Sequence, residues 1–396
     1  MHGFGLRRRE GLIVVLGLAV SMLSWLAFQP WNLTDAFMIG APFGRDFVNF
    51  WIAPHLVIEG RAPVLGDIDA YNAAIREGFG YVAQNRMIFS YPPHALLLLL
   101  PFGLLPYLPA LLLWTGLNLA ALAAATRLIG GRPSFAALAC LSPAAAAMAM
   151  YGHFGGLLAL GATLAVTESG RRPRLAGLCL ALMSVKPQFA LVLGLLLLCA
   201  GRLRCLLHAA AFATVLVALS LAAFGWAPWL RFVEVILPLQ SRLLTEFAGS
   251  SLATATSFYV TARFWDLSAG TAWAIQAVLG GLAFLTALTA LRGGPPSPAR
   301  LVVVLSGALL ALPYANHYDL AVAAPALTLL VLDRTAMPEA SPAAILVWLI
   351  APLAKLLAVA SIPVIPLAMA AALVALSRRL DTERSAMPAG ALPCSA

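Results

Sequence analysis

The chain has 396 residues, of which 62% are hydrophobic and 10% are charged, and its mean hydropathy is +0.91. A soluble domain carries about 25% charged residues, so this composition excludes a protein surrounded by water on all sides. The net charge of +9 arises from short basic clusters between apolar stretches, which is typical of membrane-protein loops rather than of nucleic-acid binding. The five cysteines lack metal-ligand spacing and are interpreted as small apolar residues, and no metal site is predicted.

Apolar stretches recur along the chain, and a spanning helix needs about 20 such residues. The candidate spans are 11–29, 95–128, 133–150, 154–168, 175–200, 205–224, 269–291, 299–314, 317–332, 343–360 and 362–377. The first follows Arg7–Arg9 without a clear cleavage site and indicates a retained signal anchor. The prolines in 95–128 predict a half-helix or interfacial helix before the span proper. We therefore expect an all-α polytopic membrane protein of about 11–13 transmembrane helices, with one domain over 1–380 and a cytoplasmic tail over 381–396.

The arginines predict the orientation, because positive charge gathers on the cytoplasmic side of short loops. Arg171, Arg172 and Arg174 precede the stretch 175–200, whereas Arg202 and Arg204 follow it. That stretch is therefore predicted to be a hairpin with Lys186 near its tip.

The same rule, applied to the whole chain, places both termini in the cytoplasm. It places outside the two long segments 30–93 and 225–268 and the short turns near 151–153, 186–188 and 313–319. Aromatic residues at helical spacing after Asp46 predict amphipathic helices at the interface within these outer segments.

Asp46 follows Gly44-Arg45 at the head of the first predicted interfacial helix. One interpretation is an N-cap, in which the carboxylate accepts a backbone N–H. The other is a general base at the membrane surface, where partial burial makes a carboxylate more basic.

Lys186 is one of two lysines in the chain and lies in an apolar stretch directly before Pro187. Ionisable groups at membrane depth favour a functional hypothesis, here a charge that faces a phosphate. The alternative is a lysine that snorkels to the surface at the tip of a hairpin.

Three further outer turns carry polar residues. His317 and Asp319 would orient or protonate a reacting group, or they form an ordinary turn capped by Asn316. Tyr91, in Tyr-Pro-Pro-His, is either part of a site or an interfacial anchor. His153 is either a ligand or a structural histidine. The arginine map places all of these turns on one face of the membrane, together with Asp46 and Lys186.

The sequence contains no Walker loop and no dinucleotide fingerprint, so nothing points to a nucleotide. An enzyme acting outside would need a donor that arrives through the bilayer, such as a lipid-linked phosphate.

An ordered series of motifs resembles glycosyltransferase family 87, also called domain of unknown function 2029, within the GT-C superfamily. The series comprises Asp46-Phe47 with Phe50-Trp51, Gly60, Tyr91-Pro92-Pro93, Pro101-Phe-Gly-Leu-Leu-Pro106, Trp114, Gly152-His153, Ala176-Gly177, Lys186-Pro187-Gln188 and His317. The resemblance covers about residues 40–335. One departure is Tyr151-Gly152-His153, where relatives often have Asn-Gly-Gln.

The resemblance implies a GT-C fold and transfer of a hexosyl or pentosyl unit, such as mannosyl, from a polyprenyl-phosphate donor. It implies an acceptor hydroxyl on a cell-envelope glycan or glycolipid, an active site outside the bacterial plasma membrane, and no cofactor. Asp46 would be the base, and Lys186 and His317 would face the donor. The other candidate substrate-binding residues are Arg45, Asn49, Tyr91, His153, Gln188, Asn316 and Asp319.

Two rival functions remain at this point. A lipid or solute transporter, or a flippase, would share the composition and the broken helices. A non-catalytic subunit of an envelope-building complex would not need Asp46 and Lys186 to converge. If the protein is an enzyme, we expect these two residues to line one outer cavity.

Overall fold

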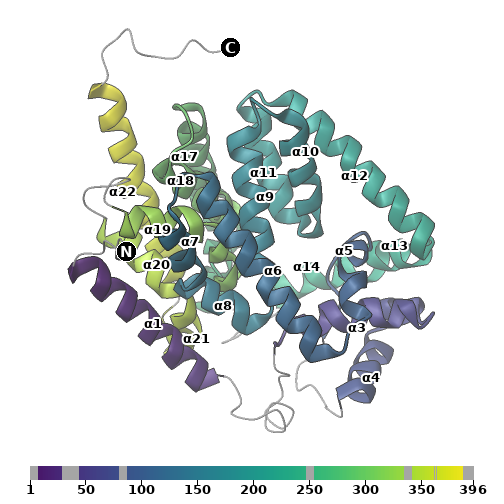
Figure 1. Cartoon of the computed structure of the whole chain (residues 1–396). Coiled ribbons are helices and arrows are strands. Elements are labelled where there is room, and N and C mark those ends of the chain that lie inside the picture. Colours follow the sequence, from purple (N-terminus) through teal and green to yellow (C-terminus); the bar gives the residue numbers. More distant parts are fainter. Residues whose placement is uncertain are drawn as a thin grey trace.

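The computed structural model describes residues 8–28, 44–79, 87–246, 254–333, 341–360, 362 and 364–386 (Figure 1). The described ranges are helical and contain no β-strand, only one isolated bridge between Ala255 and Asn316. The predicted all-α class is thereby confirmed.

The α-helices follow one another along the chain. They are α1 (Arg8–Phe28), α3 (Phe47–Ile58), α4 (Ile68–Phe79), α5 (Ala95–Gly103), α6 (Tyr107–Leu128), α7 (Pro133–Cys140), α8 (Pro143–Tyr151), α9 (Gly155–Glu168), α10 (Pro173–Leu182), α11 (Pro187–Cys199), α12 (Leu203–Phe224), α13 (Ala227–Arg231), α14 (Leu237–Glu246), α15 (Phe258–Phe264), α16 (Ala269–Ile275), α17 (Gly281–Arg292), α18 (Pro298–Ala311), α19 (Ala324–Leu332), α20 (Pro342–Ile350), α21 (Ala354–Val359) and α22 (Ile365–Ala386). Short 3₁₀ turns are η1 (Ala62–Gly66), η2 (Met183–Val185), η5 (His317–Val322) and η6 (Ala351–Leu353), and π-helical turns are η3 (Phe232–Ile236) and η4 (Gln276–Gly280).

Four described helices are long and apolar enough to cross a membrane: α1, α6, α12, and the continuous α16–η4–α17. The pair α7 and α8 forms a fifth if its 48° bend is counted as one span. The polytopic prediction is confirmed, while the number of crossings stays a prediction. As the prolines of 95–128 indicate, α5 is separate from the spanning α6. The C-terminal α22 continues to Ala386, so the predicted tail begins inside a helix.

Several apolar helices are too short to cross on their own. Helices α9, α10, α11 and α18 have 14, 10, 13 and 14 residues. At 1.5 Å per residue they span about 15–21 Å, less than the roughly 30 Å hydrocarbon core.

The stretch 175–200 is the hairpin that its flanking arginines predict. Helices α10 and α11 are joined by η2, and a Cβ placed on Gly170, before α10, would lie 3.0 Å from the guanidinium of Arg202, after α11. Both ends of the hairpin are therefore together, with Lys186 at the opposite tip.

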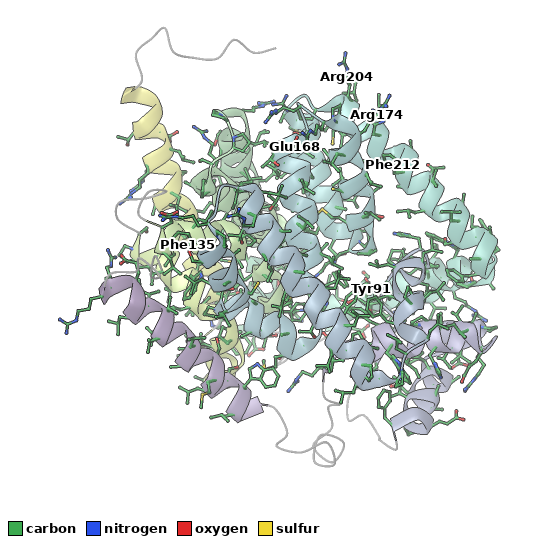
Figure 2. All side chains as sticks on the ribbon, in the orientation of Figure 1. Tyr91, Phe135, Glu168, Arg174, Arg204 and Phe212 are labelled. Atoms are coloured by element: carbon green, nitrogen blue, oxygen red, sulfur yellow. The ribbon has the colours of Figure 1, made fainter. Side chains whose placement is uncertain are left out.

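The arginine-rich loops share one end of the molecule. Arg292, at the end of α17, donates a hydrogen bond to the carbonyl of Cys199, at the end of α11. Figure 2 shows Arg174 and Arg204 at the upper end of the view, whereas Tyr91 lies far below them. The molecule thus has an arginine end and an end that carries the outer-loop helices α3, α4 and α13 (Figure 1).

The core lies around α18 and α19, whose residues 301–310 and 324–332 are all buried. Elsewhere, close packing of helices depends on small residues, which let membrane helices approach one another. A Cβ on Gly156 of α9 would lie 2.0 Å from the carbonyl oxygen of Asn118 in α6. Four of the five cysteines are described, and none of these forms a disulfide.

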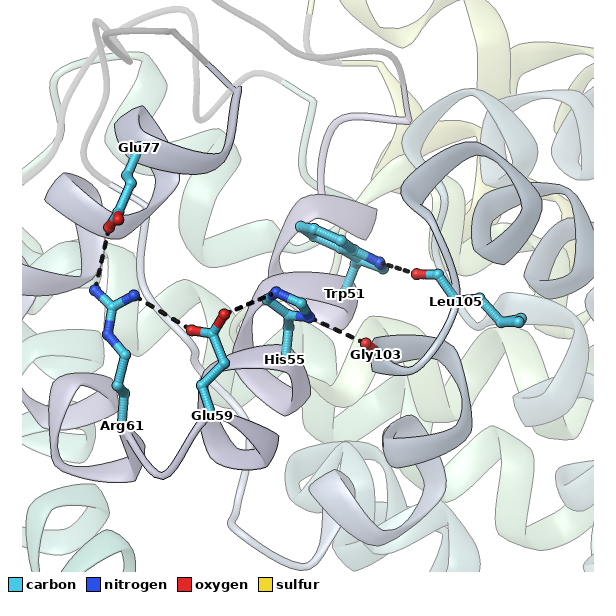
Figure 3. Close-up of polar contacts among 7 residues, drawn as sticks. All are labelled: Trp51, His55, Glu59, Arg61, Glu77, Gly103 and Leu105. Carbon is cyan, nitrogen blue, oxygen red and sulfur yellow. Dashed lines mark hydrogen bonds and ion pairs between the residues drawn. The ribbon is translucent and has the colours of Figure 1, made fainter.

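Helix α3, the first predicted interfacial helix, is buried around most of its circumference. It is tied to the α5–α6 connection by two hydrogen bonds (Figure 3). The Trp51 indole donates to the carbonyl of Leu105 at 2.8 Å. The His55 ring nitrogen Nδ1 lies 3.1 Å from the carbonyl oxygen of Gly103. Arg61, beyond the end of α3, extends this network to α4. The position of the residue before α3 is therefore well defined.

Candidate active site

Asp46 is held at the head of α3 by an unusual turn. Gly44 and Arg45 both have left-handed backbone angles, with φ of 86° and 42°. A non-glycine residue in this region is uncommon and is found mostly where the surrounding structure imposes it. The Asp46 N–H donates to the carbonyl of Tyr151 at 3.1 Å, which fixes the turn against the end of α8.

Gly152 provides the other half of this junction. Its φ is +61°, and a Cβ there would lie 2.6 Å from the Gly44 carbonyl oxygen and 2.5 Å from the Cβ of Phe47. The Gly152 carbonyl accepts a hydrogen bond from the Trp114 indole at 2.9 Å. Only glycine therefore fits at position 152, because the backbone of the Gly44 turn lies so close to it.

The Asp46 carboxylate does not cap α3, so the capping interpretation is wrong. Instead it accepts a hydrogen bond from the Tyr318 hydroxyl. Burial raises the pKa of Asp46 to about 6, and the positive charges of Arg45 and Lys186 oppose this rise. A carboxylate of that pKa is ionised near neutrality and accepts a proton more readily than an ordinary aspartate.

Tyr318 is the centre of the cluster, and the sequence alone did not single it out. Its hydroxyl accepts a hydrogen bond from the Asn316 amide at 2.9 Å, and its ring stacks on that of His153 with 4.2 Å between centroids. The Lys186 ammonium lies 5.5 Å from the Tyr318 ring centroid. The available signal was its place between His317 and Asp319, in a turn already interpreted as functional.

Lys186 forms a buried ion pair with Asp319, with 2.5 Å between Nζ and Oδ1. The exposed fractions of the two side chains are 9% and 2%, so the snorkelling interpretation is wrong. Buried charges are normally paired because desolvation of an isolated ion is costly. The pair joins the tip of the α10–α11 hairpin to η5, and it balances the charge of Lys186.

The turn before η5 shows features of both predictions, a turn capped by Asn316 and a buried polar group. Asn316 caps η5, and the second carboxylate oxygen of Asp319 accepts the Asn316 N–H at 2.9 Å. The predicted capping role of Asn316 is therefore confirmed. The turn is nevertheless buried, with His317 and Asp319 each 1% exposed, which an ordinary surface turn would not be.

His153 and Tyr91 connect the cluster to the segment before α5. The Tyr91 hydroxyl lies 3.1 Å from Nε2 of His153. Burial, with smaller contributions from Lys186 and His317, lowers the pKa of His153 well below its ordinary value. Burial also raises the pKa of Tyr91, so a neutral imidazole faces a protonated phenol.

The remaining predicted site residues lie at different distances from Tyr318. The Arg45 guanidinium lies 5.0 Å from the ring centroid of Tyr151, and the His317 ring contacts the same ring edge-on at 4.8 Å. Asn49 accepts a hydrogen bond from Tyr71 at 3.0 Å, on the side of α4. Gln188 is half-buried in the first turn of α11, two residues after Lys186.

Asp46 and Lys186 therefore both lie close to Tyr318. The enzyme interpretation also predicts that they line one outer cavity, but the cavity of about 170 Å³ that Tyr91 lines includes neither Asp46 nor Lys186. Within the part of the chain that the structure describes, no three His, Cys, Asp or Glu side chains are grouped so as to hold a metal ion.

The model of glycosyltransferase family 87 matches residues 89–313, more than half of the chain. The chain belongs to glycosyltransferase family 87. This confirms the predicted family and makes the protein a membrane glycosyltransferase.

The family 87 match contains Tyr91, His153, Lys186 and Gln188, while Asp46 and the η5 residues lie outside its limits. No curated protein and no solved structure matches the chain. The roles of individual residues in this family 87 protein therefore depend on the geometry described above.

Proposed function

We propose that this family 87 protein transfers a sugar from a polyprenyl-phosphate donor to an acceptor hydroxyl of a cell-envelope glycan or glycolipid. The observation that carries the proposal is the Asp46 carboxylate. It does not cap its helix, it is oriented by Tyr318, and it lies within the electrostatic influence of Lys186. These are the surroundings that a general base requires.

In the proposed reaction, Asp46 takes the proton of the acceptor hydroxyl as its oxygen forms a bond with the anomeric carbon. The bond from that carbon to the donor phosphate breaks, and polyprenyl phosphate leaves with its electron pair. A single displacement inverts the anomeric carbon, as the family resemblance implies. Positive groups near the departing phosphate stabilise the transition state.

Lys186 was predicted to face the donor phosphate, and this stays a prediction. Its ion pair with Asp319 supports a different first role, because the pair is neutral as a whole. We assign it to joining the hairpin tip to η5, so that Tyr318 is held beside Asp46. Arg45 and His317 are the remaining predicted contacts to the donor.

We also propose that the site faces the extracytoplasmic side and that both termini are cytoplasmic. The arginine end, shown by Arg174 and Arg204 in Figure 2, would face the cytoplasm. A donor dissolved in the bilayer then reaches the site from the lipid.

The test uses purified protein with a panel of polyprenyl-phosphate sugars and mass spectrometry of the released lipid phosphate. Asp46→Asn should lower turnover by about 10²–10⁴-fold, the usual contribution of a general base, with donor binding retained. Asp266→Asn is the matched control, because Asp266 is an exposed turn residue whose φ of 57° suits asparagine. Full activity of Asp46→Asn would remove Asp46 from the base role.

A transporter remains the second candidate, because broken apolar helices occur there as well. Its polar groups would line a path open alternately to both sides. Here Asp46, Lys186, His153 and Asp319 gather in one cluster around Tyr318. Movement of polyprenyl-phosphate sugar across proteoliposomes without any transfer to acceptor would favour the transporter.

A further inference from the structure

A second binding feature lies outside the Asp46 cluster. The cavity of about 170 Å³ is bounded by η1, by the segment that leads into α5, and by α13 with η3. Its lining is mostly apolar, with Leu65, Phe89, Leu96, Phe232 and Ile236 among its walls. Apolar cavities with a few placed polar groups are the usual form of a ligand site.

Arg231 is the one charged side chain in the lining of this cavity. Within the described ranges its guanidinium has no hydrogen bond or ion pair, although Glu234 follows one turn later. Its aliphatic stem packs on Gly66, where an added Cβ would lie 2.5 Å from the Arg231 Cγ. The lack of a side chain at position 66 thus leaves room for the arginine to lie along the cavity wall.

The helix that carries Arg231 has two different faces. Pro228, Phe232 and Ile236 are buried toward the cavity. On other sides, large apolar side chains are exposed, as expected for contact with lipid: Trp226, Leu230, Val233 and Leu237, with exposed fractions of 67%, 43%, 55% and 42%. Directly after Arg231 the helix becomes π-helical, and π-helical turns are frequent at functional sites.

Tyr91 joins the cavity to the cluster around Asp46. Its ring lines the cavity, and its hydroxyl contacts His153, which stacks on Tyr318. Arg231 and Tyr91 therefore line the same cavity, and Tyr91 connects it to His153.

We propose that this cavity binds the phosphate of the polyprenyl-phosphate donor through Arg231. The guanidinium is suited to phosphate because its fork of N–H groups binds two oxygens at once. Lys186 is already paired with Asp319, whereas Arg231 forms no ion pair within the described ranges and can bind an anionic ligand. This inference rests on the proposed function, and it names the residue that holds the donor.

The size of the cavity agrees with this occupant. Its volume of about 170 Å³ is small beside the roughly 300–1,000 Å³ of typical ligand pockets, so we place only the phosphate head group in it and not the polyprenyl chain. The chain would extend along the lipid-facing side of α13 and η3.

The test measures binding of polyprenyl phosphate to the full-length protein in lipid nanodiscs. Arg231→Gln should weaken binding by about tenfold or more, because charge-assisted hydrogen bonds are lost. Arg242→Gln, an exposed arginine on the neighbouring α14, is the matched control and should bind like wild type. Gly66→Ala should weaken binding by displacing Arg231, while Gly116→Ala, where a Cβ meets nothing within 4 Å, should not.

Two further probes identify what is recognised. Uncharged polyprenol should bind equally to wild type and Arg231→Gln, and inorganic phosphate should compete weakly or not at all. Equal loss of polyprenol binding would overturn the phosphate assignment, as would unchanged polyprenyl-phosphate binding in Arg231→Gln. So would the absence of polyprenyl-phosphate binding to the wild-type protein.

The failure of this inference differs from failure of the proposed function. If sugar is transferred and Arg231→Gln keeps the wild-type KM for donor, only the Arg231 assignment fails. If polyprenyl phosphate binds through Arg231 but no donor supports transfer, only the transferase mechanism fails.

Discussion

At the scale of single residues, the protonation state of Asp46 controls the proposed chemistry. Its pKa of about 6 means that the carboxylate is mostly ionised at pH 7. A base must be unprotonated to act, so activity should rise with pH through this pKa. We expect kcat/KM to fall about tenfold per pH unit below pH 6, measured with a soluble acceptor over pH 4.5 to 8. A flat profile across this interval would contradict Asp46 as the base.

Removal of the Tyr318 hydroxyl should shift the pH dependence of kcat/KM. Its hydroxyl accepts from Asn316, so its own proton is directed to Asp46. This hydrogen bond stabilises the ionised carboxylate, and its loss in Tyr318→Phe should raise the pKa of Asp46 and move the acid limb to higher pH. Tyr259→Phe is the control, because that buried hydroxyl donates instead to the carbonyl of Leu244. An unmoved limb in Tyr318→Phe would show that the tyrosine only packs.

The sequence pointed to most of the cluster but not to its pairing. Asp46, Lys186 and His317 were placed together because arginine positions predict sidedness. The bond between Lys186 and Asp319 joins residues 133 positions apart, and no local pattern encodes it. Tyr318 was not among the predicted site residues, although it lies between His317 and Asp319.

At the scale of elements, the contact between the α3 and α8 ends should be sensitive to one methyl group. Gly152→Ala places a Cβ against the Gly44 carbonyl as well as in a left-handed conformation. Gly201→Ala has a similar strain, with φ of +77°, but its Cβ meets nothing within 4 Å. Both should lose about 1–2 kcal/mol from backbone strain, whereas only Gly152→Ala should also lose at least tenfold in kcat. Thermal unfolding and turnover distinguish the two, and equal kinetics would refute the contact.

The hairpin tip offers a second test at this scale. Ser184 donates to the carbonyl of Ala181, so the hydrogen of its bond to His94 must come from the histidine Nε2. Glutamine can replace Nε2 and asparagine cannot reach as far, so His94→Gln should keep more activity than His94→Asn. Combining His94→Asn with Ser184→Ala should cost no more than either change alone, as residues of one hydrogen bond are not additive. Fully additive losses in kcat/KM would contradict this coupling.

The sequence predicted some of the helix breaks and missed others. Proline positions and flanking arginines predicted the separation of α5 from α6 and the hairpin of α10 and α11. The predicted spans 154–168 and 299–314 correspond closely to α9 and α18, because polar residues, glycine and proline flank these apolar stretches. Hydropathy did not show that the predicted spans 133–150 and 343–360 are broken, the first into α7 and α8 and the second into α20, η6 and α21.

At the scale of the whole molecule, the proposed orientation can be measured by cysteine labelling. In a background without other cysteines, Cys199 lies exposed at the arginine end, and Ala73→Cys lies exposed on α4 at the opposite end (Figure 1). A membrane-impermeant maleimide should label Ala73→Cys on intact cells and Cys199 only after permeabilisation. The reverse labelling pattern would mean that the protein has the opposite orientation, with Asp46 on the cytoplasmic side.

The short helices have a consequence for the fidelity of the reaction. A base that activates an acceptor hydroxyl would activate water equally well, and the sugar would then be lost to hydrolysis. Because α9, α11 and α18 reach only about 20 Å from the arginine end, the proposed orientation would place the cluster within the depth of the hydrocarbon. Water is scarce there, and excluding it prevents this side reaction. Shortened helices would thus make the bilayer itself the shield that preserves the donor until an acceptor arrives.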